Sequence, residues 1–182
     1  ALALGGGAAV GAPAQVRIVV RTNFAETSFW APDLVASKGK VGFGATLPDS
    51  ITTQTVTLVA SDDQGRVGMV REKVEVFQEL YARSDLPAVL TLGDRVQVTS
   101  AVRNFTAEKV TATIGIASDA LDVVGPAKQT LHVPAGETAA AAFEIRPLRA
   151  GEVEYEVWTE GGGVKDVERR TLWVELAGVP TV

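Results

Sequence analysis

Carboxylates are the side chains of this sequence that could most readily do chemistry. Glu152, Glu154 and Glu156 recur at every second position, and Asp62-Asp63 stands in a turn-like segment. Calcium needs six to eight oxygen ligands that a loop draws together. Alternate residues of a strand point along one face and do not converge on an ion. We therefore expect the glutamates to form a solvated strand face, and we predict no metal site.

The other residue types that could catalyse a reaction lack suitable partners. The chain has no cysteine and a single histidine, His132, so a thiol nucleophile, a disulfide and a multi-histidine metal site are excluded. Ser28, Ser37 and Ser100 lack a G-x-S-x-G context, and the glycines at 161–163 lack the lysine of a phosphate-binding loop. We predict no catalytic residue, no cofactor site and no enzymatic activity, with His132 on a strand, at the surface or half-buried.

Three aromatic residues, Phe24, Phe29 and Trp30, are close together near the start of the chain. They could form a recognition patch, or they could pack in a core beneath a loop. Each aromatic side chain removes a large apolar area from water when it is buried. The sequence favours core packing.

Period-two alternation identifies the elements that must position these residues. The clearest example is Val153, Tyr155 and Val157, which we expect to point inward from the glutamate row. Similar runs cover 96–102 and 110–116, whereas 138–143 is rich in alanine but is bounded like a strand. Runs separated by turns at intervals of about 8–12 residues are typical of a sandwich. The predicted fold class is all-β, with antiparallel β-sandwiches of the immunoglobulin-like type.

The strand runs fall into two series. Residues 16–78 carry runs near 16–20, 41–47, 55–60 and 70–76, which is too little for an independent core. We predict a partial sandwich domain over 16–78 and a complete one over 79–178. Part of the apolar face of 41–58 should then lack partner strands, so we expect either self-association or a covering by the apolar tail.

Residues 1–15 consist almost wholly of small and apolar residues and show no strand or helix period. Glycines at 5–7 predict a flexible linker. The functional alternative is a protease-accessible tail, for which Leu2, Leu4 and Val10 are the candidate cleavage positions. This stretch lacks the basic start and long apolar run of a signal peptide, and we expect it to be internal to a longer chain.

Composition limits the classes of partner. The net charge is −5 and the pI is near 5.0, with no basic stripe, which argues against nucleic-acid binding. No apolar run approaches the roughly 18 residues that a membrane-spanning helix needs.

Several motifs carry a resemblance to a known family. Arg21-Thr-Asn-Phe-Ala-Glu-Thr-Ser-Phe-Trp30 and Leu47-Pro-Asp-Ser-Ile-Thr52 resemble the alpha-2-macroglobulin family just after its protease-bait region. Gly65-Arg-Val-Gly68 and the stretch from Leu92 to Asn104 also resemble that family. The resemblance implies the macroglobulin-like variant of the β-sandwich fold, and residues 1–15 would then be the end of the bait region.

The resemblance implies a function. Members of this family trap proteases broadly: a protease cuts the bait, the molecule rearranges, and a thioester elsewhere captures the attacker. Without cysteine, this chain holds no thioester. We therefore expect a non-catalytic scaffold fragment of such a broad-spectrum endopeptidase inhibitor. We expect the protein to be located in the periplasm, or outside the cell or in the cell envelope. Its expected partners are target proteases and further macroglobulin-like domains. The alternative is a cell-surface adhesion or carbohydrate-binding module.

Overall fold

Twelve β-strands make up the regular structure of residues 16–178, the part of the chain that the computed structural model describes. The strands are β1 (Arg17–Arg21), β2 (Thr53–Ser61), β3 (Val67–Glu75), β4 (Leu80–Ser84), β5 (Val89–Thr91), β6 (Val96–Asn104), β7 (Val110–Ala117), β8 (Leu121–Val124), β9 (Lys128–Val133), β10 (Thr138–Pro147), β11 (Gly151–Gly161) and β12 (Val164–Glu175). These described residues contain no helix, so the all-β prediction is confirmed.

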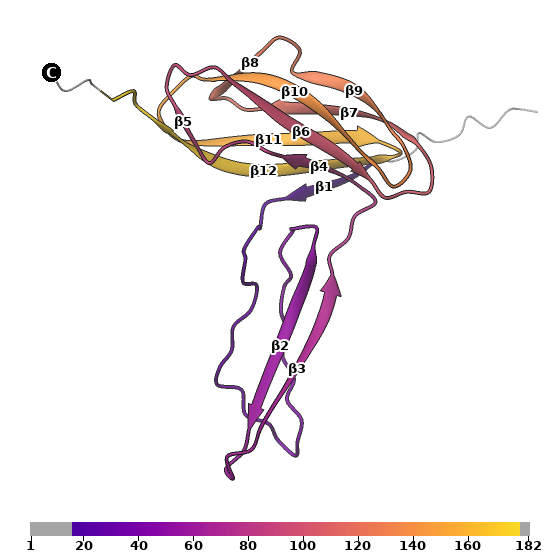
Figure 1. Cartoon of the computed structure of the whole chain (residues 1–182), viewed down its shortest axis with the longest axis vertical. Coiled ribbons are helices and arrows are strands. Elements are labelled where there is room, and N and C mark those ends of the chain that lie inside the picture. Colours follow the sequence, from indigo (N-terminus) through magenta and orange to yellow (C-terminus); the bar gives the residue numbers. More distant parts are fainter. Residues whose placement is uncertain (1–15, 179–182) are drawn as a thin grey trace, which may run out of the picture.

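The strands after residue 79, together with β1, form a sandwich of two sheets. One sheet has the order β1-β12-β11-β7-β9, with β5 also paired to β12, and the other has the order β4-β6-β10-β8. Figure 1 shows the two layers stacked, with β11 and β12 in one layer. The alanine-rich run at 138–143 lies in β10, because its side chains alternate between core and solvent as a strand requires.

The core lies between the two sheets and is mostly aliphatic, with Phe143 and Tyr155 among its members. Val153 and Val157 are fully buried and Tyr155 is nearly so, while Glu152 and Glu154 are exposed and Glu156 is half-buried against Arg169. The register predicted for this strand is confirmed. The same alternation buries Ala112, Ile114 and Ile116 in β7, and Val98 and Val102 in β6.

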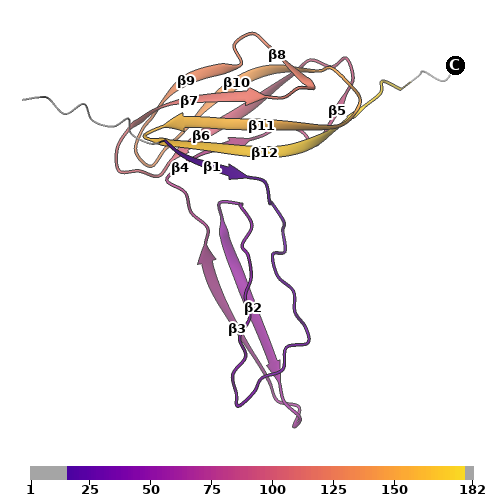
Figure 2. The same cartoon turned by 180° about the vertical axis from the view of Figure 1, so that it is seen from behind.

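The β2–β3 hairpin forms an arm outside the sandwich. Its two strands pair only with each other, from Thr53↔Glu75 to Ser61↔Val67. Figures 1 and 2 show this arm projecting from the sandwich, with the 22–50 segment running beside it. Large apolar side chains of the arm are exposed, among them Val59, Val70 and Met69. The predicted apolar face without partner strands is present only in part, because Val41 and Phe43 are exposed but Val56 and Leu58 are half-buried. The predicted covering by the tail concerns residues outside the described ones.

The segment 41–47 was predicted as a strand, and this prediction is wrong. The structure places no strand there, and only an isolated bridge joins Ser37 and Lys40 nearby. Gly42 and Gly44 supply no side chains to pack, which weakens a strand, and no neighbouring strand offers a ladder. Val41 and Phe43 are exposed as a result.

Strand β1 does not join the arm. It pairs in parallel with β12, from Arg17↔Val164 to Arg21↔Glu168, and so extends the sheet of the sandwich. Figure 2 shows β1 on the side of the sandwich that faces the arm. The start of the described chain is thus fixed to its last strand. The division into domains 16–78 and 79–178 stays a prediction.

Candidate functional site

The most unusual feature of the sandwich is a buried cluster of charges where β1 ends. Arg21 is 5% exposed, Asp166 0% and Glu168 2%. The Arg21 side chain donates from Nε to Asp166 Oδ1 and from Nη2 to Asp166 Oδ2, each over 2.9 Å, and its Nη2 lies 3.5 Å from Glu168 Oε2. We call these three residues the arginine joint. Arginine suits this place, because its planar fork matches a carboxylate bidentately.

The arginine joint completes the open edge of the opposite sheet. Strand β4 is an edge strand, and its outward backbone groups need partners once they are buried. The Ala82 amide donates to Asp166 Oδ2 over 2.7 Å, and the Ala82 carbonyl accepts from Arg21 Nη2. The Ser84 amide donates to Glu168 Oε2 over 3.1 Å. Side chains of β1 and β12 therefore take the place of a further strand beside β4.

A second arginine and an aromatic ring close the joint from outside. Arg170 donates from Nε to Glu168 Oε1, so the two carboxylates face two guanidinium groups. The guanidinium carbon of Arg170 lies 3.8 Å from the ring centroid of Phe24, a cation–π contact. Phe24 thereby holds the chain against β12 directly after Arg21.

The ionisation of Arg21 is secure. Burial acts to lower its pKa, but the hydrogen bond to Asp166 and the charges of Asp166 and Glu168 outweigh this effect, and the pKa is raised above its ordinary value. Arg21 therefore stays charged wherever the protein is folded.

Asp49 anchors the chain where it leaves β1. Its Oδ2 accepts hydrogen bonds from the backbone amides of Thr22 and Asn23, each over 2.8 Å. Its own amide donates to the Asn23 carbonyl over 2.6 Å. The motifs at 21–30 and 47–52 therefore meet at one place, the arginine joint and the turn beside it. This convergence makes the joint the candidate functional site.

The aromatic trio does not pack as one unit. Phe24 is half-buried on Arg170, and Phe29 stacks on Phe43 with ring centroids 4.9 Å apart. Trp30 is 82% exposed. Phe29 is also exposed, at 38%. The prediction of core packing is therefore wrong for Phe29 and Trp30, because the segment that carries them runs outside the sandwich, beside the β2–β3 arm.

The other candidates have structural partners. Asp62 binds Arg66 within the β2–β3 turn, and His132 lies exposed with its Nδ1 3.1 Å from Thr111 Oγ1. Between residues 16 and 178, no three histidine or acidic side chains group together as metal ligands would. The candidate cleavage positions Leu2, Leu4 and Val10 lie outside the described residues.

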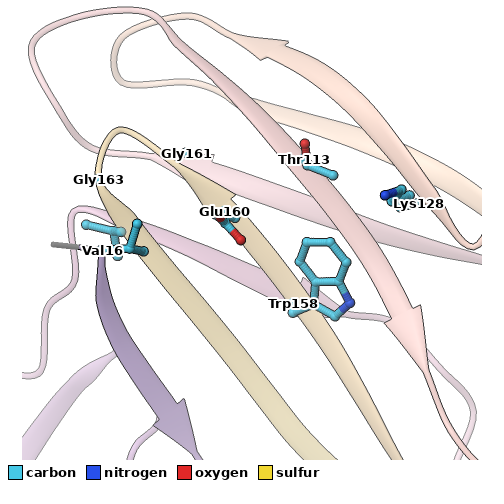
Figure 3. A pocket seen from close by; sticks show the side chains of 8 residues that line it. Val16, Thr113, Lys128, Trp158, Glu160, Gly161 and Gly163 are labelled. Atoms are coloured by element: carbon cyan, nitrogen blue, oxygen red, sulfur yellow. The ribbon is translucent and has the colours of Figure 1, made fainter. Parts of the chain in front are cut away.

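A recess of about 340 Å³ on the outer face of the sandwich contains Trp158 (Figure 3). The indole lies against Gly115, where an added Cβ would fall 2.6 Å from the ring, and Lys165 Nζ lies 5.1 Å from the ring centroid. The ring is engaged within the protein, so the recess does not offer the free aromatic surface on which a sugar would stack.

Sequence reasoning missed Asp166, Glu168 and Arg170. In a surface strand, charged residues at alternate positions point to water. No local pattern marks Asp166 and Glu168 as inward, and Arg170 is exposed like an ordinary surface residue. Only Arg21 carried a signal, as the first residue of the motif at 21–30. The pairing of β1 with β12 turns that isolated arginine into the partner of two buried acids.

The comparison with protein families agrees with this architecture. The model of the "Alpha-2-macroglobulin family" matches residues 27–116, which include the Asp49 turn, the arm and the first strands of the sandwich. The chain belongs, over this matched part, to the alpha-2-macroglobulin family. The family resemblance predicted from the motifs is confirmed.

A solved structure also shares this fold. A crystal structure of a mutant Salmonella alpha-2-macroglobulin matches with a TM-score of 0.57 and 21% sequence identity, over 74% of this chain. The chain spans only 9% of the length of that macroglobulin. The likeness supports a macroglobulin-type β-sandwich.

Proposed function

We propose that this chain is a non-catalytic scaffold segment of an alpha-2-macroglobulin-like, broad-spectrum endopeptidase inhibitor. The family match supports this proposal, since the family consists of protease inhibitors rather than catalysts. The observation that carries it is the position of β1, which follows residues 1–15 directly and is locked to β12 by Arg21.

The proposed mechanism is mechanical. Residues 1–15 act as the end of the bait, and Leu2, Leu4 and Val10 are candidate cut sites. While the bait is intact, the upstream chain restrains β1. After a cut, only the parallel ladder with β12 and the arginine joint hold β1, so the strand can move relative to the chain before it. The arginine joint connects β1 to the sandwich and to the chain that leads into the arm, so a displacement of β1 would alter the contacts of both.

The proposed setting is a larger protein in the periplasm or outside the cell. In that setting 16–78 is a partial macroglobulin-like domain and 79–178 a complete one. The exposed apolar side chains of the arm support contacts with other domains of the same chain, or self-association of the fragment. None of the described residues belongs to a helix that could cross a membrane.

The test uses the full-length parent protein. It is incubated with an endopeptidase such as elastase, and hydrolysis of a large protein substrate is compared with hydrolysis of a small peptide. A trap lowers hydrolysis of the large protein substrate and spares hydrolysis of the small peptide. We also expect the earliest cut in the parent protein to fall within residues 1–15. First cuts within 80–176, or equal loss of both activities, would contradict the proposal. Binding to a glycan array without any effect on proteases would favour the carbohydrate-binding alternative.

A further inference from the structure

The base of the β2–β3 arm is joined to the sandwich by short links that belong to no strand. We infer that the arm turns relative to the sandwich about two pivots in these links, 50–51 and 77–78, and that the Gln78 side chain is a latch that holds the observed orientation. The inference goes beyond the proposed function and does not depend on it, because it rests on contacts within this chain.

The first pivot lies in the link from β3 to β4. The Val76 amide donates to the Thr52 carbonyl over 2.9 Å, so Val76 still belongs to the arm. The Glu79 carbonyl accepts from the Phe105 amide over 2.7 Å, so Glu79 already belongs to the sandwich. Residues 77–78 lie between these two anchors and outside any strand. Hinges in proteins are a few residues of this kind, at the end of an element, that absorb a change in backbone dihedral angles.

The second pivot lies in the link into β2. Asp49 is tied to the sandwich, because its carboxylate accepts hydrogen bonds from the amides of Thr22 and Asn23 directly after β1. Thr52 is tied to the arm by its bond to the β3 side. Residues 50–51 lie between these two anchors. The bond at Thr52 also places the two pivots side by side at the base of the hairpin, so both can turn about one axis.

There is space for this movement beside the pivots. A cleft of about 610 Å³ is lined by Val19 and Leu80 of the sandwich and by Ile51 and Val76 at the base of the arm. In the described part of the chain, β2 and β3 pair with each other and with no strand of the sandwich. Figure 2 shows the arm extending away from β1 below the sandwich. A turn of the arm toward β1 would therefore narrow the cleft without breaking a sheet.

The Gln78 side chain opposes such a turn. Its Nε2 donates to the Leu80 carbonyl over 2.9 Å and to Asp166 Oδ1 over 3.1 Å. Asp166 is fully buried, and the same Oδ1 accepts from Arg21 Nε. A hydrogen bond to an ionised acceptor is stronger than one between neutral groups. The latch therefore fixes the first pivot to the arginine joint, and through the shared oxygen the orientation of the arm depends on whether Arg21 is in place.

The test measures distances between the arm and the sandwich in the folded chain. Because the sequence has no cysteine, Gln64→Cys in the turn of the arm and Thr171→Cys on β12 introduce two exposed sites for spin labels. Double electron–electron resonance gives the distribution of distances between the labels. Gln78→Ala removes the latch, and Gln97→Ala, at an exposed position of β6, is the matched control. Circular dichroism checks that each variant is folded.

We expect one narrow distribution of distances in the labelled chain and in its Gln97→Ala variant. Gln78→Ala should raise the population of other arm orientations roughly 10- to 100-fold, as the loss of a hydrogen bond to a charged group predicts. Its distribution should therefore broaden or gain a second maximum. Arg21→Lys, which keeps the charge but loses the planar fork, should change the distribution in the same direction.

Three results would overturn the inference. The first is a Gln78→Ala distribution that matches the one of the labelled chain, and the second is equal broadening in Gln97→Ala. The third is a broad distribution when the latch is intact. An unchanged distribution in Arg21→Lys would overturn the dependence of the arm on the arginine joint.

Discussion

Arg21 and Asp166 lie 145 positions apart in the chain and form a buried, two-pronged ion pair with both N–O distances at 2.9 Å. The pair joins the first described strand to the last one. It also satisfies the amide and carbonyl of Ala82 on the opposite sheet. One interaction therefore links β1, the two layers of the sandwich and the chain that leads into the arm.

Removing the arginine should destabilise the sandwich strongly. Arg21→Ala leaves two buried carboxylates without their main counter-charge, which typically costs about 3–5 kcal/mol. Urea unfolding followed by circular dichroism measures the free energy of unfolding. Arg17→Ala is the matched control, since Arg17 is exposed, and it should change stability by less than about 0.5 kcal/mol. Similar losses in the two variants would show that the joint contributes little.

The Trp158 ring should make Gly115 intolerant of a side chain. Gly115→Ala places a Cβ 2.6 Å from Cζ2 of the indole, so the ring or the strand must shift. Overpacking of this kind costs about 1–3 kcal/mol. In Gly68→Ala the new Cβ meets no atom within 4 Å, and the variant should gain up to about 1 kcal/mol in strand stability. Thermal unfolding compares the two. An unchanged melting temperature in Gly115→Ala would mean that the ring is free to move.

Trp30 should be dispensable for the stability of this chain. Its side chain is 82% exposed, so Trp30→Ala should alter the free energy of unfolding by less than about 0.5 kcal/mol. Phe24→Ala should cost about 1–3 kcal/mol, because it removes a half-buried ring and its cation–π contact with Arg170. Chemical denaturation of both variants measures these changes in the free energy of unfolding. A Trp30→Ala loss as large as that of Phe24→Ala would place the tryptophan in a core after all.

The turn between β2 and β3 should respond to acid through Asp62. Hydrogen bonds from the Arg66 amide and side chain hold the pKa of this carboxyl below its usual value. A lowered pKa in the folded state means that the contribution to turn stability is complete above the ordinary aspartate pKa and is lost as the pH falls through the lowered one. Carboxyl NMR should show Asp62 titrating below the usual range, and Arg66→Ala should raise its midpoint. Titration at or above the usual value would refute the turn geometry.

Much of the sandwich could be predicted from the sequence because local alternation encodes it. In β11, Val153, Tyr155 and Val157 alternate with glutamates, and burial of the apolar face leaves one possible register. The same logic placed β6 and β7. It failed at 41–47, where an alternating pattern with glycines found no partner strand to pair with.

The joint could not be predicted, because its register is a long-range property. The apolar residues Val16, Ile18 and Val20 of the first run are exposed, and the side chains that turn inward from this run include Arg21. Asp166 and Glu168 likewise point inward from a strand whose charges suggest a wet face. Burial of Arg21 is favourable only when Asp166 and Glu168 are present, and burial of these acids is favourable only when Arg21 is present. No single segment of the sequence contains both sides of this pairing.

Hydrogen exchange of the segment 16–21 tests most directly whether Arg21 holds β1 on the sandwich. Mass spectrometry of the unmodified chain should show slow exchange at 16–21 and fast exchange at 41–46, which has no strand. In Arg21→Ala, protection of 16–21 should fall to the level of 41–46, while 110–117 in the sandwich core stays protected. If 16–21 exchanges as fast as 41–46 in the unmodified chain, or if Arg21→Ala leaves its protection unchanged, the account is contradicted.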